Sequence, residues 1–178
     1  TNFCGLVKFY SAAHGAGVKP IIGADFWVKS DLLGDQQFRL TALAMNAEGY
    51  KNVTELISKA YLRGHVKGRA VIEQSWLIEH QQGVILLSGA KDGDLGKMLL
   101  KGNQVAVTEI TTFYKTHFPN RYYLELIRTN RVNEENYLHL AIDLAAQQGL
   151  PVVATNEVIF ADETLFDAHD IRVCINQG

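Results

Sequence analysis

The chain has 178 residues and a formal net charge of −2, with 47% hydrophobic and 20% charged residues. This is the composition of an ordinary globular protein, and it excludes disordered and collagen-like classes. No apolar run approaches the roughly 18–20 residues needed to span a bilayer, so we expect no membrane partner. A chain that bound nucleic acid mainly by neutralising phosphates would be basic, so we do not expect this one to do so alone. Cys4 and Cys174 form no metal-type pair, and reduced thiols in a cytoplasmic protein are the expectation.

Apolar periodicity predicts short strands alternating with helices along the whole chain. The first helix should end near Gly15 and Gly17, which can supply left-handed stops. Asn133 is predicted to cap the helix that follows it. The expected strands are residues 18–28, 38–46, 83–90, 121–128 and 151–156; the expected helices are residues 3–14, 48–63, 76–82, 93–102, 104–117, 134–148 and 165–175; and residues 64–70 are expected to form a loop.

This alternation indicates an α/β protein with a parallel sheet, either a barrel or a doubly wound fold. Five strands do not close an ordinary eight-stranded barrel, which typically needs about 250 residues. A barrel would therefore lack strands at one or both ends. The chain starts without Met, directly in a helical pattern, and it stops at residue 178 without an evident terminal element. We therefore expect it to be part of a longer polypeptide.

The glycine-rich stretch at residues 89–97 follows a predicted strand and opens a helix, as a phosphate-binding loop does. The Walker pattern needs a glycine, four residues and then Gly-Lys-Ser/Thr. Here the spacing between Gly89 and Gly96 is too long, and Met98 follows Lys97. The motif fails, and a glycine-rich turn into a helix is the preferred interpretation.

Candidate functional residues follow the apolar run at residues 152–154, which delivers Thr155, Asn156 and Glu157 to the edge where parallel-sheet enzymes keep their chemistry. Asp25 lies near the outgoing end of the first strand. The six histidines include no His-x-His and no HExxH pattern, so nothing indicates a self-contained zinc site.

Several stretches together resemble one family: GLVKFY, KPIIGADFWV, LTALAMNAEGYKNVTELISKAY, LLSG, YYLELIR, GLPVVATNEV and FDAHDIRV. They are similar to the PHP (polymerase and histidinol phosphatase) domain of bacterial DNA polymerase III alpha subunits, most of all the proteobacterial type. The resemblance covers essentially the whole chain in unbroken order. It implies a distorted seven-stranded (β/α)7 barrel that is incomplete here. Residues 1–178 would be part of a single PHP domain, without its N-terminal strands, their His-x-His ligands and its C-terminal end.

Active members of this family hold a trinuclear metal centre, which neutralises phosphate and activates a water. The resemblance places Asp25 where active members carry Glu, and Glu157 where they carry Asp. Arg39 stands in place of a His, and a guanidinium cannot ligate because it stays protonated. Ala90 stands where some members have a Cys, and Ile159 where they have a His. Asp25 and Glu157 are therefore weak, vestigial metal ligands, while Arg39, Ala90 and Ile159 mark vacated ligand positions.

The resemblance then implies a non-catalytic scaffold that docks the proofreading exonuclease (epsilon) subunit. Other polymerase III holoenzyme subunits and DNA would be contacted through the rest of the parent chain, a DNA-directed DNA polymerase that uses Mg²⁺. No cofactor is expected in residues 1–178 themselves.

The alternative is a metal-dependent phosphoesterase, 3′–5′ exonuclease or pyrophosphatase that holds Zn²⁺ or Mn²⁺ with Asp25, Glu157 and ligands upstream of residue 1. Against this stands the simpler possibility that these two carboxylates pair with Arg39 or cap a helix. A free-standing histidinol phosphatase would require intact histidines at the vacated positions.

Overall fold

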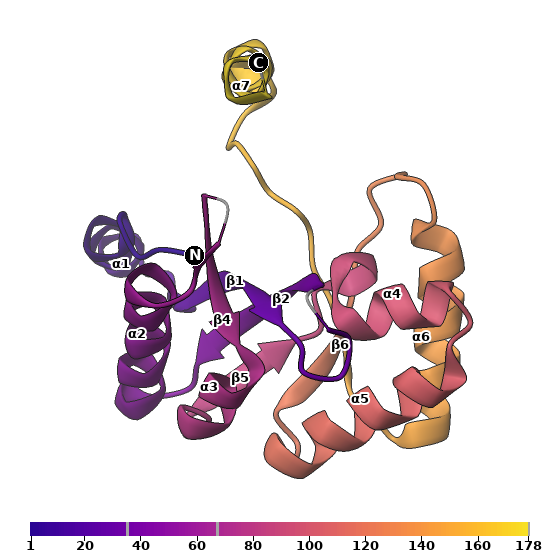
Figure 1. The fold of residues 1–178 in the computed structure, drawn as a ribbon. Helices are drawn as coiled ribbons and strands as arrows, with labels where there is room; N and C mark the ends of the chain where they lie inside the picture. The colour runs from indigo at the N-terminus through magenta and orange to yellow at the C-terminus, as the bar shows by residue number, and fades with distance from the viewer. Residues whose placement is uncertain (35, 67, 178) are drawn as a thin grey trace.

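The structure, a computed structural model, describes residues 1–34, 36–66 and 68–177. It is a mixed α/β protein in which helices alternate with strands, as predicted, and the sheet has seven strands instead of the five expected (Figure 1). The strands are β1 (Gly23–Lys29), β2 (Gln37–Ala44), β3 (His65–Val66), β4 (Arg69–Glu73), β5 (Val84–Leu87), β6 (Tyr122–Leu126) and β7 (Val152–Ala154).

The helical elements include two short 3-10 turns, and all of them except α7 and the η2 turn before it lie close to this sheet. They are α1 (Leu6–Gly15), α2 (Ala47–Leu62), α3 (Gln74–Glu79), η1 (Ala90–Asp92), α4 (Asp94–Leu100), α5 (Gln104–His117), α6 (Glu134–Gln148), η2 (Glu163–Leu165) and α7 (Phe166–Gln177). In Figure 1, α2 lies to one side of the sheet and α4, α5 and α6 gather at the other end, beside β6. Among the described residues, no helix has the length and apolarity that crossing a membrane requires.

The strand order is β3-β4-β1-β2-β5-β6-β7, and the sheet is mostly parallel, as expected, with β2 and β3 as the exceptions. β1, β4, β5, β6 and β7 run the same way, whereas β2 is antiparallel to both of its neighbours and β3 is antiparallel to β4. The short link at residues 30–36 explains the reversal, because a parallel crossover needs a dozen or more residues. Only an antiparallel return fits between β1 and β2.

The expected loop at residues 64–70 is also corrected, because it contributes to two strands. β3 and the start of β4 form a small antiparallel ribbon, with His65 opposite Ala70 and Val66 opposite Arg69. Lys67, part of the same expected loop, lies outside the described residues. β4 then pairs in parallel with β1, which extends the sheet beyond the strands predicted from sequence.

Alternating burial on β1 and β2 separates a core face from a functional face. Phe26, Val28, Leu40 and Ala42 are buried, and they form one hydrophobic cluster with Val53 and Leu56 of α2. Successive side chains on a strand point to opposite faces. Asp25, Arg39 and Thr41 therefore share the other, less buried face of the same strands.

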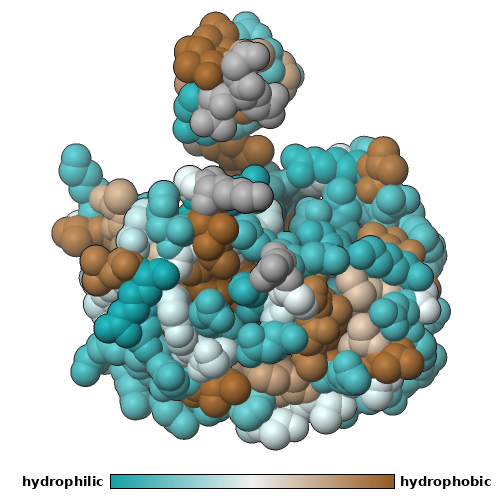
Figure 2. Space-filling view, viewed as in Figure 1, coloured by the Kyte–Doolittle hydropathy of each residue, from teal (hydrophilic) through white to brown (hydrophobic). Residues whose placement is uncertain are grey.

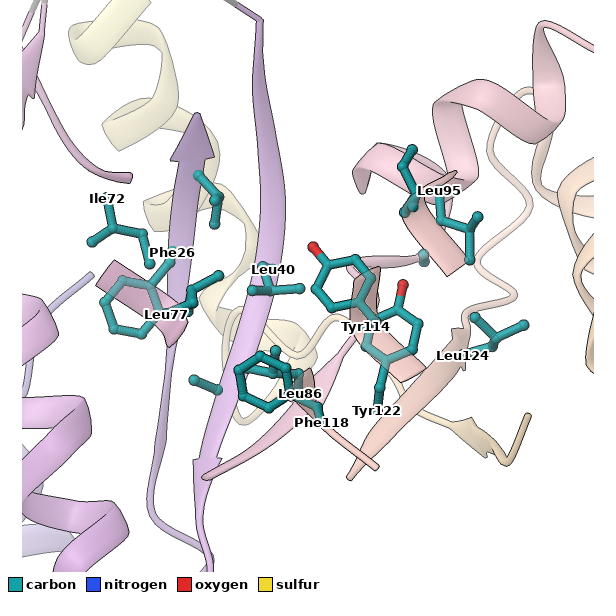
Figure 3. Packing of buried hydrophobic residues seen from close by; sticks show 14 of the residues in the cluster. Phe26, Leu40, Ile72, Leu77, Leu86, Leu95, Tyr114, Phe118, Tyr122 and Leu124 are labelled. Atoms are coloured by element: carbon teal, nitrogen blue, oxygen red, sulfur yellow. The ribbon is translucent and has the colours of Figure 1, made fainter. Parts of the chain in front are cut away.

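The core continues to the α5 end of the sheet. There the rings of Tyr114 and Tyr122 stack with centroids 4.0 Å apart and nearly parallel planes, and Figure 3 shows both hydroxyls on the same side. Leu86, Leu124 and Phe118 lie in the same cluster. This packing fixes β5, β6 and α5 relative to one another.

The last helix, α7, stands away from the rest of the molecule at the end of an extended segment (Figure 1). Its hydrophobic side chains are visible at the top of Figure 2, and Phe166, Ile171 and Ile175 are 55%, 61% and 78% exposed. The site residue Glu157 lies in the segment that connects β7 to this helix.

Candidate functional site

Asp25 and Arg39 are brought together by the antiparallel pairing of β1 and β2. Asp25 lies opposite Thr41, and Arg39 lies opposite Trp27. Asp25 and Arg39 are therefore diagonal neighbours on one face, a separation that a long side chain can reach across. Arg39 Nη2 donates to Asp25 Oδ2 at 3.1 Å, and Thr41 Oγ1 donates to Asp25 Oδ1 at 2.5 Å.

Glu157 approaches from the other end of the sheet, beyond the last residue of β7. Arg39 Nη1 donates to Glu157 Oε1 at 2.8 Å, so one guanidinium bridges the two carboxylates predicted from sequence. Arg131 Nη1 donates to the remaining oxygen, Glu157 Oε2. We call Asp25, Arg39, Arg131 and Glu157 the Arg39 cluster.

The electrostatics of the Arg39 cluster favour its charged forms. Burial by itself lowers the pKa of Arg39, but the charges of Asp25 and Glu157 and the hydrogen bonds to them outweigh it and raise the pKa above its ordinary value. Burial raises the pKa of Glu157, but Arg39 and Arg131 outweigh it and leave this pKa below its ordinary value. The cluster is an ionised and electrically balanced network.

Ala90 lies beside this cluster. It is buried in η1 and, together with Arg39, Arg131 and Glu157, lines a cavity of about 10 Å³. That is roughly the space that one water molecule needs. A centre of several metal ions with a bound phosphate does not fit there.

Ile159 is the predicted site residue that the structure does not bring to the cluster. It lies two residues beyond Glu157, is 47% exposed, and is not among the residues that line the cavity beside Arg39. The segment after β7 thus carries the Glu157 carboxylate into the cluster while Ile159 remains at the surface.

The residues present do not fit the metal centre that the family resemblance implies. All four carboxylate oxygens of Asp25 and Glu157 accept hydrogen bonds, three of them from guanidinium groups. A divalent cation would have to displace those fixed positive charges before it could reach an oxygen. Within residues 1–34, 36–66 and 68–177, no three His, Cys, Asp or Glu side chains converge in a way that could hold a metal ion.

Sequence reasoning missed Arg131, because the residue lies in a loop and belongs to no motif. Asn133 occupies the position before α6, but its side chain makes no capping hydrogen bond, so the predicted cap is wrong. Glu134, the next residue, accepts hydrogen bonds from the backbone and side chain of Thr129 and from the backbone of Arg131. A loop closed by a buried glutamate has no strong sequence signature.

The glycine-rich stretch at residues 89–97 is explained by packing. Gly89 has φ +74°, and a Cβ there would lie 2.1 Å from the carbonyl oxygen of Arg39. A Cβ on Gly96 would lie 2.1 Å from the carbonyl oxygen of Ala90. Gly89 lets the start of η1 pass close to β2, and Gly96 lets α4 pack closely against η1, which agrees with a structural turn and not a phosphate loop.

Comparison with known proteins gives one consistent family. The PHP domain family matches residues 1–129. Over all 178 residues, the chain is 61% identical to DNA polymerase III subunit alpha of Vibrio cholerae serotype O1 and 60% identical to that of Escherichia coli K12. It is 46% identical to the same subunit of Pseudomonas aeruginosa, and it spans 15% of the length of each of these relatives. The chain belongs to the PHP domain family, in the form found in proteobacterial DNA polymerase III alpha subunits.

Proposed function

We propose that this chain is a PHP-domain portion of a replicative DNA polymerase III alpha subunit and that it serves there as a non-catalytic structural module. The observation that supports this most directly is the occupation of all four oxygens of Asp25 and Glu157 by hydrogen-bond donors. A divalent cation that used those oxygens for phosphoester hydrolysis would have to compete with these donors, three of which belong to permanently charged guanidiniums. Here they fasten the segment after β7 to β1 and β2 instead.

The Arg39 cluster provides the charge balance of a metal site without its chemistry. A guanidinium is permanently charged and planar, and it can bridge two carboxylates with fixed geometry. It cannot lower the pKa of a bound water or act as a Lewis acid. The Arg39 cluster would therefore keep the shape of this edge of the sheet although the domain could no longer hydrolyse a phosphoester.

As the finer part of the proposal, this module docks the proofreading exonuclease (epsilon) subunit, with the remaining holoenzyme subunits and DNA contacted elsewhere on the parent chain. The relatives carry the name of a subunit, which supports an assembly of several polypeptides. Removal of mismatched nucleotides would then belong to the exonuclease, so this domain would need no hydrolytic site of its own.

Size-exclusion chromatography tests the docking directly. The full-length alpha subunit should co-elute with its proofreading exonuclease, and a subunit lacking residues 1–178 should not. Nucleotide incorporation on primed DNA checks that the truncated subunit is folded. Co-elution of the exonuclease with an active truncated subunit would contradict the docking role.

A further inference from the structure

The Glu157 carboxylate is held by two guanidiniums, and the second one comes from a loop that the family resemblance does not single out. We propose that Arg131 keeps metal ions from Glu157 by binding its carboxylate. The buried Glu134 is the positioning residue that holds Arg131 in place. This inference rests on the proposal that the metal site is degenerate. It adds a second barrier to metal binding besides the loss of ligands at residues 39, 90 and 159.

The loop at residues 129–134 is folded around the Glu134 carboxylate. Glu134 is only 3% exposed, and its oxygens accept hydrogen bonds from Thr129 N at 2.6 Å, Thr129 Oγ1 at 2.7 Å and Arg131 N at 3.1 Å. The Glu134 amide in turn donates to the carbonyl of Arg131 at 3.2 Å. Asn130 and Asn133 adopt left-handed backbone conformations, which Asn tolerates better than most residues. The loop therefore has a defined conformation.

This conformation determines where the Arg131 side chain can reach. Its backbone N–H is bound by Glu134, and its Nη1 donates to Glu157 Oε2. A side chain projecting from a fixed backbone loses less conformational entropy when it pairs than one projecting from a loose loop. Glu134 thus stabilises the Arg131–Glu157 pair although it does not touch Glu157.

The neighbouring pair Arg128 and Glu135 provides an internal comparison. Arg128 Nε lies 2.6 Å from Glu135 Oε1, and both side chains are more than half exposed. Arg128 lies just before the loop at residues 129–134, and Glu135 lies in the first turn of α6 next to Glu134. In the described part of the chain, the ion pairs of Arg128 and Glu135 are with each other and not with the Arg39 cluster. R128A removes a positive charge, as R131A does, and E135A removes a negative charge, as E134A does, but neither of these control substitutions frees Glu157.

The charge of the Arg39 cluster opposes metal binding in the unsubstituted chain, and a change at residue 39 removes only one of the two opposing charges. Two carboxylates balance two guanidiniums, so a divalent cation meets no net negative charge. Replacing Arg39 with His would supply a ligand and free Asp25 Oδ2 and Glu157 Oε1. Arg131 would still bind Glu157 Oε2 and repel a cation at short range.

Mn²⁺ binding to the full-length subunit, measured by electron paramagnetic resonance and calorimetry, tests the role of Arg131. Relative to R39H alone, R39H/R131A should bind Mn²⁺ about tenfold more tightly or better, because a neighbouring positive charge and a competing donor are removed together. The matched control R39H/R128A should bind as weakly as R39H. Equal affinity in R39H and R39H/R131A, or equal gains from R131A and R128A, would overturn the inference.

The positioning role of Glu134 is tested in the same R39H background. R39H/E134A should gain Mn²⁺ affinity because the loop no longer directs Arg131 to Glu157, whereas R39H/E135A should not. Adding R131A to R39H/E134A should then give little further gain. A full additional gain would show that Glu134 does not act through Arg131.

The unsubstituted subunit separates this inference from the proposed function. Stoichiometric Mn²⁺ at Asp25 and Glu157 in that protein would contradict the degenerate site itself. Absence of Mn²⁺ there, combined with equal affinities of R39H and R39H/R131A, would contradict only the role of Arg131.

Discussion

Arg39 places a permanent charge near the start of β2, on the less buried face of the sheet. Its guanidinium reaches Asp25 on the neighbouring strand and Glu157 beyond β7, residues that are far apart in the sequence. Exposed ion pairs contribute about 0–1 kcal/mol each, and Asp25 is 51% exposed. The main effect of Arg39 is therefore on which group can approach the carboxylates, and less on the free energy of unfolding.

Asp94 is a second residue whose surroundings determine its charge, although it lies outside the Arg39 cluster. It is fully buried at the start of α4, where burial raises its pKa from 3.8 to about 6 despite hydrogen bonds from Tyr114 and from the Leu95 amide. The folded chain therefore retains a proton that the unfolded chain releases at lower pH.

The raised pKa of Asp94 predicts a fall in the free energy of unfolding between about pH 4 and pH 6. The fall should be of the order of 3 kcal/mol, since the unfolded state then binds fewer protons than the folded state. D94N should remove most of this fall, which denaturant unfolding at several pH values would measure. The control is D92N, because Asp92 is nearby in the sequence and exposed; this variant should show the same fall in the free energy of unfolding as the unsubstituted protein. An unchanged slope in D94N would contradict the assignment.

At the level of elements, the helix and strand pattern was largely predictable, but the direction of β2 and the existence of β3 and β4 were missed. The short link at residues 30–36 was a readable signal for an antiparallel return. Residues 64–70 contain two glycines and two basic residues besides a histidine, so their local composition is that of a loop. The structure of residues 64–70 depends on the pairing of β4 with β1. This pairing joins segments far apart in the sequence, so local composition could not predict it.

The junction between β5 and η1 gives a prediction at this scale. G89A should lower the free energy of unfolding by about 2 kcal/mol or more, because φ is +74° and the new Cβ would meet the carbonyl oxygen of Arg39 at 2.1 Å. Gly102 is the matched control, since it has φ +67° but no neighbouring atom within 4 Å of the position that a Cβ would occupy. G102A should cost only about 1 kcal/mol, from backbone strain alone. Equal losses by urea unfolding would show that the close approach at Gly89 is unimportant.

At the scale of the whole molecule, the sequence identified Asp25, Arg39 and Glu157, and the structure places all three in one cluster. The family pattern carried that prediction, because residues on β1, β2 and the segment after β7 share no local spacing. Arg131 and Glu134 could not be found in this way. Their roles depend on how the loop before α6 closes in three dimensions.

The Arg39 cluster also connects parts of the chain that are far apart in the sequence. Glu157 lies on the segment that leaves the sheet toward α7, and it is tied to β2 by Arg39 and to the loop before α6 by Arg131. These ion pairs fasten the connecting segment to the sheet and to the loop before α6. They therefore have a structural use, whatever else the site does.

The central claim, that the metal site is degenerate, is tested most directly by the metal content of the full-length subunit. The protein would be purified without chelator and analysed by inductively coupled plasma mass spectrometry. We predict no stoichiometric zinc or manganese that depends on the cluster, so that D25N/E157Q leaves the metal content unchanged. Stoichiometric metal that is lost in D25N/E157Q would contradict the account and restore the phosphoesterase alternative.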